Sequence, residues 1–128
     1  MDKVIHFEIP VDDQARANEF YASVFDWEMN DNDMGGGIVY TSAMTVATDE
    51  KMLPKEPGAI NGGIMKRTSD TPAPVITIQV DSIDEALKKV EAEGGATVQP
   101  RTEIPNMGAF AYFKDSEGNT LGLWESHG

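Results

Sequence analysis

The sequence predicts an α+β protein in which two tandem β-α-β-β-β modules form an open barrel around a cleft. Three observations predict this fold. Alternating apolar residues and then a helical apolar stripe open the chain, the same order returns in the second half, and a polar stretch with two prolines separates the copies. We expect one domain over residues 1–128, with modules at residues 1–65 and 75–128 and a linker at residues 66–74.

Each module begins with a strand in which apolar and polar side chains alternate. The first strand covers residues 4–11 and the second covers residues 75–80. His6 and Glu8 share the polar face of the first strand. One face of each curved sheet is expected to be covered by the helix of its own module. The other face of each sheet is left to meet the corresponding face of the second module, so the two sheets would enclose a cleft.

A helix follows each of these strands. Asp12 and Asp13 open the first helix, predicted over residues 14–25, and Asp81 and Ser82 open the second. The first apolar stripe, expected to lie in the core, contains Ala17, Phe20, Tyr21 and Val24. The second contains Ile83, Ala86, Leu87 and Val90. The two copies are offset by 69 residues (81 − 12), which supports an internal duplication.

Short extended segments with turn signals complete each module. In the first half, strands are predicted over residues 38–41, 44–48 and 61–65, and Gly35-Gly36-Gly37 is predicted to form a hairpin turn. The glycine run has neither the Lys-Ser/Thr of a phosphate-binding loop nor a strand before it. In the second half, the corresponding strands are predicted over residues 96–98, 109–114 and 120–124.

Composition excludes several classes of function. The chain has a net charge of −12, which repels the phosphates of nucleic acids and anionic membrane surfaces. No run approaches the roughly 18 apolar residues that a membrane span needs. The chain contains no cysteine, so it has no disulfide framework, no thiolate metal site and no cysteine nucleophile. We therefore expect a cytoplasmic protein that binds neither nucleic acid nor membranes.

Three sequence motifs resemble those of a known family. Residues 6–13 read His-Phe-Glu-Ile-Pro-Val-Asp-Asp, and residues 17–27 read Ala-x-x-Phe-Tyr-x-x-Val-Phe-x-Trp. Residues 113–123 read Phe-x-Asp-x-Glu-Gly-Asn-x-Leu-Gly-Leu. Together they resemble the vicinal-oxygen-chelate superfamily, which includes glyoxalases, bleomycin-resistance proteins and extradiol dioxygenases. The resemblance implies a paired barrel whose cleft often holds a divalent metal bound by side chains from both halves.

The metal ligands that this resemblance implies are mostly missing. His6 occupies the position of the first ligand. The other three positions fall at or near Gly62, Val75 and Gly122, whose side chains offer no lone pair. A single imidazole does not retain a divalent ion against water, since catalytic sites use about three protein ligands. We therefore expect no metal and no other cofactor, which disfavours the glyoxalase reaction and ring-opening dioxygenation.

Strand alternation predicts which side chains line the cleft. The candidate ligand-binding residues are His6, Glu8, Thr77, Gln79, Thr120 and Trp124. Met107, Phe110 and Tyr112 are looser candidates. A few polar groups beside an aromatic wall are typical of sites for small organic molecules. The leading hypothesis is a protein that binds a small apolar or aromatic molecule between its modules without a metal.

Two other classes of function stay open. The protein could be a lyase, isomerase or dioxygenase-type enzyme in which His6 acts with Glu8 as a general base, Glu8 orienting the imidazole or raising its pKa. Alternatively, His6 and Glu8 could form a reduced metal site with water. A purely structural or partner-binding domain is the third class. We expect a homodimer, and the linker permits the modules to pair within one chain or to exchange between chains.

Overall fold

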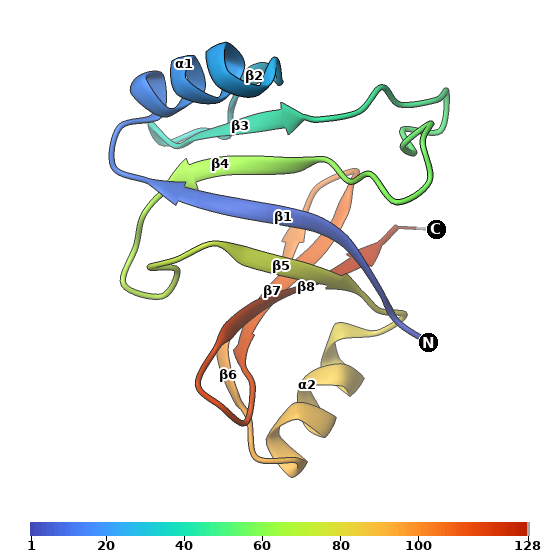
Figure 1. Ribbon diagram of the computed structural model, residues 1–128. Helices are drawn as coiled ribbons and strands as arrows, with labels where there is room; N and C mark the ends of the chain where they lie inside the picture. The colour runs from blue at the N-terminus through green and yellow to red at the C-terminus, as the bar shows by residue number, and fades with distance from the viewer. Residues whose placement is uncertain (128) are drawn as a thin grey trace. The chain divides into compact units, whose positions relative to one another are not determined.

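The computed structural model describes residues 1–127 and contains the β-α-β-β-β order twice (Figure 1). The first copy consists of β1 (Lys3–Val11), α1 (Gln14–Phe25), β2 (Glu28–Asp33), β3 (Val39–Met44) and β4 (Gly62–Lys66). The second consists of β5 (Val75–Gln79), α2 (Ile83–Ala92), β6 (Ala96–Ile104), β7 (Gly108–Lys114) and β8 (Thr120–Ser126). The predicted α+β class and the two tandem modules are thus confirmed. Neither helix in this part of the chain is long and apolar enough to cross a membrane.

Contacts divide the chain into two compact units. The first unit contains residues 6–74, and the second contains residues 1–5 together with the chain from Val75 onward. In the first unit the strand order is β2-β3-β4-β1, in which β1 and β4 are parallel and the other pairs are antiparallel. The core of this unit is built on Val11, Ala43 and Ile64. These side chains share one face of the sheet, where Ala17 and Tyr21 of α1 pack against them.

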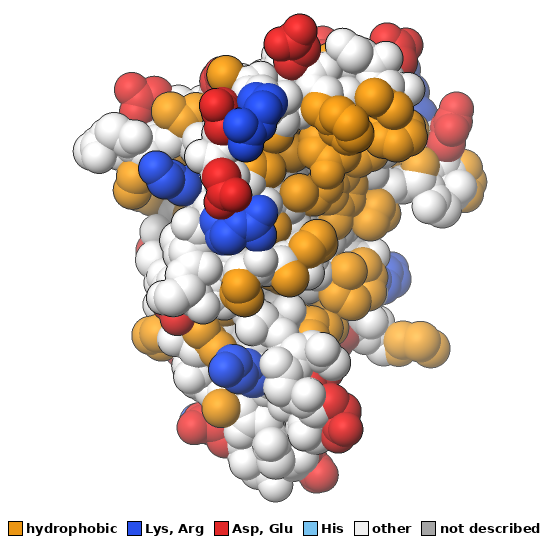
Figure 2. Space-filling view, turned by 60° about the vertical axis from the view of Figure 1, so that its left-hand side comes forward, with side chains coloured by type: hydrophobic (Ala, Val, Ile, Leu, Met, Phe, Trp, Pro, Cys, Tyr) orange, Lys and Arg blue, Asp and Glu red, His pale blue; other side chains and the backbone are white. Residues whose placement is uncertain are grey.

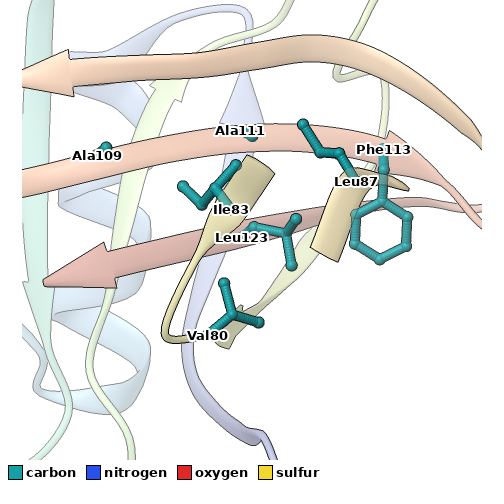
Figure 3. Packing of buried hydrophobic residues seen from close by; sticks show 7 residues of the cluster. All are labelled: Val80, Ile83, Leu87, Ala109, Ala111, Phe113 and Leu123. Carbon is teal, nitrogen blue, oxygen red and sulfur yellow. The ribbon is translucent and has the colours of Figure 1, made fainter. Parts of the chain in front are cut away.

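The second unit repeats this arrangement with a larger core. Its strand order is β5-β8-β7-β6, in which β5 and β8 are parallel and the other two pairs are antiparallel. Ile83 and Leu87 project from α2 onto the sheet, where they meet apolar side chains of β7 and β8 (Figure 3). The buried cluster contains Val80, Ile83, Leu87, Ala109, Ala111, Phe113 and Leu123. The stripe predicted for this helix therefore faces the core.

Both helices begin at the predicted residues. Asp13 is the N-cap of α1, and its side chain accepts a hydrogen bond from the backbone N–H of Arg16. Ser82 caps α2 in the same way, accepting from the N–H of Glu85. The carboxylate of Glu125 on β8 also accepts a hydrogen bond from the N–H of Ile83 at 2.8 Å, which ties the start of α2 to its sheet.

The core position predicted for the α1 stripe is wrong in part. Phe20 and Val24 are each 55% exposed, and none of the residues of α1 is fully buried. The helix packs instead through Tyr21, whose ring stacks on Trp27 with centroids 4.9 Å apart. Helical spacing identifies side chains that share a face, but the extent of the sheet beneath decides how many become buried. Figure 2 shows hydrophobic side chains gathered at the surface beside charged ones.

Two predictions for the first-half strands also need correction. The strand β2 is absent from the predicted set because its sequence, Glu-Met-Asn-Asp-Asn-Asp, has no apolar alternation. It lies at the edge of the sheet, and among residues 1–127 its one partner strand is β3. The strand predicted over residues 44–48 is wrong, since β3 ends at Met44 and only an isolated bridge from Thr48 to Pro54 follows. The predicted hairpin turn is confirmed: all three residues of the Gly35–Gly37 run have positive φ, which favours glycine.

Truncation of Ile83 to alanine is expected to destabilise the protein by about 2–5 kcal/mol, because its fully buried side chain would leave a cavity in the α2 core. The matched control is Ile76→Ala on β5, where the side chain is 47% exposed and the cost should stay below about 1 kcal/mol. Urea unfolding followed by circular dichroism measures both free energies. Equal losses in the two variants would contradict the described core.

Candidate functional site

Each unit has a sheet face that its own helix does not cover, and the predicted site residues lie on these faces. In the first unit, Glu8 is opposite Gly63, and Gly63 is opposite Ser42 on β3. Because alternate residues share a face, His6 and Tyr40 belong to the same side of the sheet. The apolar cluster and α1 occupy the other side. The His6 and Glu8 face is therefore the helix-free face of this unit.

The second unit presents an analogous helix-free face. Thr77 is opposite Gly122, and Gln79 is opposite Trp124. Trp124 is in turn opposite Phe110, and Gly122 is opposite Tyr112. Thr120 shares this side of β8 by alternation. The structure thus brings Thr77, Gln79, Thr120 and Trp124 to one face, together with two of the looser candidates. Met107 is not among them, since it lies in the turn between β6 and β7 and is mostly exposed.

Tyr40 is a member of the site that was not predicted. Its hydroxyl lies 2.8 Å from Nε2 of His6. Burial lowers the pKa of His6 below its ordinary value of 6.5, so the imidazole is neutral at pH 7. The predicted rise in the pKa of the imidazole is therefore wrong. The Tyr40 hydroxyl contacts the imidazole directly.

Glu8 acts on the phenol. Its side chain is 9% exposed, which is unusual for a carboxylate. Burial raises the pKa of Tyr40 far above its usual range, and the negative charge of Glu8 and a hydrogen bond with its carboxylate raise it further. The phenol therefore keeps its proton. His6, Tyr40 and Glu8 form a linked polar group on the helix-free face.

Gly63 leaves the space that Tyr40 occupies. A Cβ atom at this position would overlap the hydroxyl and ring of Tyr40. Gly62 leaves space on the opposite face of the sheet, where a Cβ atom would overlap the ring of Phe7. The sequence signal for Tyr40 was therefore present in the glycine pair, but it does not identify which aromatic residue fills the space.

The residues of this chain do not fit the divalent metal ion that is typical of the family its sequence resembles. The β4 residue that shares a face with His6 is Gly63, and Tyr40 already fills the space above it. Val75 is 1% exposed and apolar. A Cβ atom at Gly122 would lie 2.8 Å from Oγ1 of Thr77, so this position too is closed by a neighbour. Across residues 1–127, no three His, Asp or Glu side chains are grouped closely enough to hold a metal ion.

The helix-free face of the second unit contains a fixed aromatic side chain. The indole N–H of Trp124 donates to Oγ of Ser126 at 3.1 Å, and the side-chain amide of Gln79 donates to the same oxygen at 3.2 Å. The indole lies over Gly108, where a Cβ atom would be 2.7 Å from Cζ2 of the ring. Phe110 and Tyr112 meet edge to face nearby, with ring centroids 5.8 Å apart. Aromatic rings therefore make up much of the helix-free face of the second unit.

One hollow of about 230 Å³ lies elsewhere in the first unit. It is lined by Asp26, Glu28, Met44, Thr45, Val46 and Ala47. None of the candidate residues contributes to it, and it is open to solvent. We therefore do not assign the function to this hollow.

Substitution of Gly63 by alanine is expected to destabilise the protein by about 1–3 kcal/mol, because the added methyl group would force Tyr40 from its position. In a Tyr40→Ala background the same substitution should cost less than about 0.5 kcal/mol, since the overlapping ring is gone. A double-mutant cycle measured by urea unfolding tests this coupling. Additive losses from the two substitutions would show that Tyr40 does not occupy the space above Gly63.

Comparison with known proteins supports the resemblance seen in the sequence. The family model described as "Glyoxalase/Bleomycin resistance protein/Dioxygenase superfamily" matches residues 3–123. "Putative glyoxylase CFP32" of Mycobacterium bovis is 32% identical over 122 residues, a match that covers 94% of this chain and 44% of that protein. The chain thus spans less than half the length of this relative. A "Glyoxylase-like domain-containing protein" of Didymella fabae is 27% identical over 116 residues, covering 88% of this chain and 85% of the relative.

Solved structures share the fold at low sequence identity. A hypothetical protein from Bacillus halodurans superposes with a TM-score of 0.68 at 15% identity, covering 99% of this chain and 96% of that one. Methylmalonyl-CoA epimerase of Streptomyces coelicolor, solved in complex with 2-nitronate-propionyl-CoA, gives 0.68 at 14% identity, covering 98% of each chain. The duplicated β-α-β-β-β order, the matching family model and the shared fold lead to one conclusion. The chain belongs to the glyoxalase, bleomycin-resistance protein and dioxygenase superfamily.

Proposed function

We propose that this protein binds a small organic molecule with an apolar or aromatic part in a cleft between its two modules, without a divalent metal ion. The observation that carries this proposal is the contact between His6 and Tyr40 above Gly63. The family resemblance assigns His6 to the first metal-ligand position, and in this chain the His6 side chain is hydrogen-bonded within the protein. Polar and aromatic groups on the two helix-free faces are then the means of recognition.

The chemistry of these faces suits a mostly neutral ligand. Trp124 and Phe110 offer apolar area, while Thr77, Gln79 and His6 offer a small number of hydrogen-bonding groups. Sites for small molecules combine these features. The chain has a net charge of −12, which disfavours strongly anionic ligands. We propose a neutral aromatic ligand, in a cytoplasmic protein that assembles as a homodimer.

A screen of neutral aromatic compounds by thermal shift tests this proposal. The screen is run on the full chain once with EDTA and once with added Zn²⁺. A bound compound at about 100 times its Kd adds about 2.7 kcal/mol to the unfolding free energy, which raises Tm by several degrees. We expect the same shift in both conditions. A shift that requires Zn²⁺ would contradict the proposal.

Replacement of Trp124 by leucine is expected to weaken binding of a compound found in this screen by about tenfold, because the indole is the largest apolar group on its face. Trp27→Leu is the matched control, since Trp27 stacks on Tyr21 beside α1 and should affect stability but not affinity. Isothermal titration calorimetry gives both Kd values. Unchanged affinity in the Trp124 variant would exclude this face as the binding surface.

A second candidate function is a lyase, isomerase or dioxygenase-type reaction in which His6 transfers a proton. Its support is the linked group of His6, Tyr40 and Glu8, together with structural neighbours named epimerases. If a compound found in the screen is turned over, His6→Ala should lower kcat by about 10²-fold or more, the scale of general acid–base catalysis. Full turnover by this variant, measured in a steady-state assay, would exclude His6 as the proton carrier.

A further inference from the structure

The helices of the two modules can be compared position by position. Their N-cap residues lie 69 positions apart (82 − 13), which is the offset that relates the two halves of the sequence. At this offset Gln14 of α1 corresponds to Ile83 of α2, and Asn18 corresponds to Leu87. Ile83 and Leu87 are the buried residues of α2. The first helix therefore has polar side chains where the second helix has its main core contacts.

These polar side chains of α1 make hydrogen bonds to the sheet. The side-chain amide of Gln14 donates to the carbonyl oxygen of Val39 at 2.8 Å. The side-chain amide of Asn18 donates to the carboxylate of Asp31 at 3.0 Å. Hydrogen bonds thus take the place of the apolar contacts that the second helix makes with its sheet, so that less of the apolar surface of α1 enters the core.

The apolar side chains of α1 are exposed where those of α2 are charged. Phe20 and Val24 lie one turn apart, and each is 55% exposed. The corresponding residues of α2 are Lys89 and Glu93, which are exposed as well. A surface helix of a globular protein normally has charged and polar residues on its outward side. The second helix follows this pattern, whereas the first helix has aromatic and aliphatic side chains there.

Ring contacts join the exposed side chains of α1 to their neighbours. The ring centroid of Tyr21 lies 5.2 Å from that of Phe20 and 4.9 Å from that of Trp27. The ring of Phe25, which is 56% exposed, lies 6.3 Å from that of Tyr21. We call Phe20, Tyr21, Val24, Phe25 and Trp27 the α1 patch. No charged residue occurs from position 20 to position 25. Aromatic surfaces with few charges are typical of the centres of protein interfaces.

We propose that the α1 patch is the interface of the homodimer and is covered by the α1 patch of a second copy of this chain. The inference rests on the homodimer part of the proposed function and is independent of the ligand. A two-fold interface places the same surface of each copy against itself, so this surface must be compatible with its own duplicate. Two copies that each have a net charge of −12 repel each other wherever carboxylates meet. An uncharged apolar patch avoids this repulsion.

Charges at the two ends of α1 favour an antiparallel pairing of the helices. In a two-fold arrangement that sets Phe20 against the partner's Val24, the first turn of each helix meets the end of the other. Arg16 lies in the first turn, whereas Asp26 and Glu28 follow the last residue and are exposed. The helix dipoles act in the same sense, since the N-terminal end is partly positive and the C-terminal end is partly negative. Opposite charges therefore meet at both ends of the pair.

The charged groups needed for this pairing are available. Within residues 1–127, none of Arg16, Asp26 and Glu28 forms an ion pair. The two carboxylates that precede α1 are already engaged within the chain. Asp13 caps the helix, and Asp12 forms an ion pair. The guanidinium of Arg16 is therefore the group at this end that remains to be paired.

The size of the α1 patch fits a weak dimer. The exposed parts of Phe20, Val24 and Phe25 correspond to roughly 300 Å² of apolar surface, if a whole aromatic side chain counts as about 150–250 Å². The largest apolar patch on a typical monomer is about 300–600 Å² and is often functional. A polar rim would bring the contact closer to the roughly 800 Å² per partner of a standard interface. We therefore expect a Kd on the order of 10 µM.

Sedimentation velocity of the full chain, over concentrations from about 1 µM to about 1 mM, tests this interface. The test variant combines Phe20→Lys with Val24→Glu, which gives α1 the charged residues of α2 and keeps the net charge at −12. We expect wild type to form dimers. The variant should raise the Kd by about 100-fold or more, because it places charges at the centre of the contact.

The matched control combines Ile76→Lys with Met107→Glu, which makes the same chemical change at exposed apolar residues of the second unit. We expect this control to form dimers as wild type does, with circular dichroism showing that all three proteins are folded. A wild-type dimer that persists in the Phe20 and Val24 variant would overturn the α1 interface and leave the proposed homodimer standing. Wild type that stays monomeric up to about 1 mM would contradict both, while the thermal-shift screen would still decide the ligand proposal.

Hydrogen exchange of the wild-type protein locates the contact without any substitution, so the test remains decisive if the double variant does not fold. Exchange is measured by mass spectrometry at concentrations below and above the Kd. We expect the backbone amides of α1 to be better protected at the higher concentration and those of α2 to be unchanged. Protection that rises in other segments but not in α1 would refute the proposed interface.

Discussion

The contact of His6 with the Tyr40 hydroxyl depends on the missing side chain of Gly63. Because the phenol enters this space, His6 is paired within the protein and lies in a partly buried, low-dielectric surrounding that keeps it neutral. Glu8 is paired in turn, which limits the cost of burying its carboxylate. Hydrogen bonds within the protein thus stabilise the polar face of the first unit. We propose that this face recognises its ligand by hydrogen bonding rather than by metal coordination.

The two helices make these faces possible. Each helix covers only one side of its sheet, and the apolar clusters around Ile64 in the first unit and Ile83 in the second lie on that side. Parallel pairing of β1 with β4, and of β5 with β8, places the first strand of each module beside its last. His6 and Trp124 can therefore vary in chemistry while the cores remain unchanged. This separation allows the chemistry of the helix-free faces to change while the fold of the family is kept.

Regular patterns made much of the fold predictable from the sequence. Alternation identified β1 and β5, the caps Asp13 and Ser82 identified where both helices begin, and the repeated order identified the duplication. The strand β2 escaped prediction because edge strands can be polar on both faces. The exposure of Phe20 was not predicted, because burial of a helical side chain depends on how far the sheet extends beneath the helix.

The candidate site was predictable only in part. Alternation identified the faces of His6, Glu8, Thr77, Gln79 and Trp124, which require nothing beyond the strand period. Tyr40 required knowledge of strand register, since its side chain meets His6 across three strands and 34 positions of sequence. In the sequence, Gly62 indicates the loss of a metal ligand, whereas the structure shows that the neighbouring Gly63 makes room for the Tyr40 side chain.

Metal content directly tests our proposal that hydrogen bonding within the protein has replaced metal coordination in this family member. The protein should be purified without chelators or metal-affinity resin, equilibrated with equimolar Zn²⁺, Ni²⁺ or Mn²⁺, desalted, and assayed for bound metal by elemental analysis. We expect far less than one ion per chain, with no difference between wild type and His6→Ala. One tightly held ion per chain that is lost in His6→Ala would contradict it.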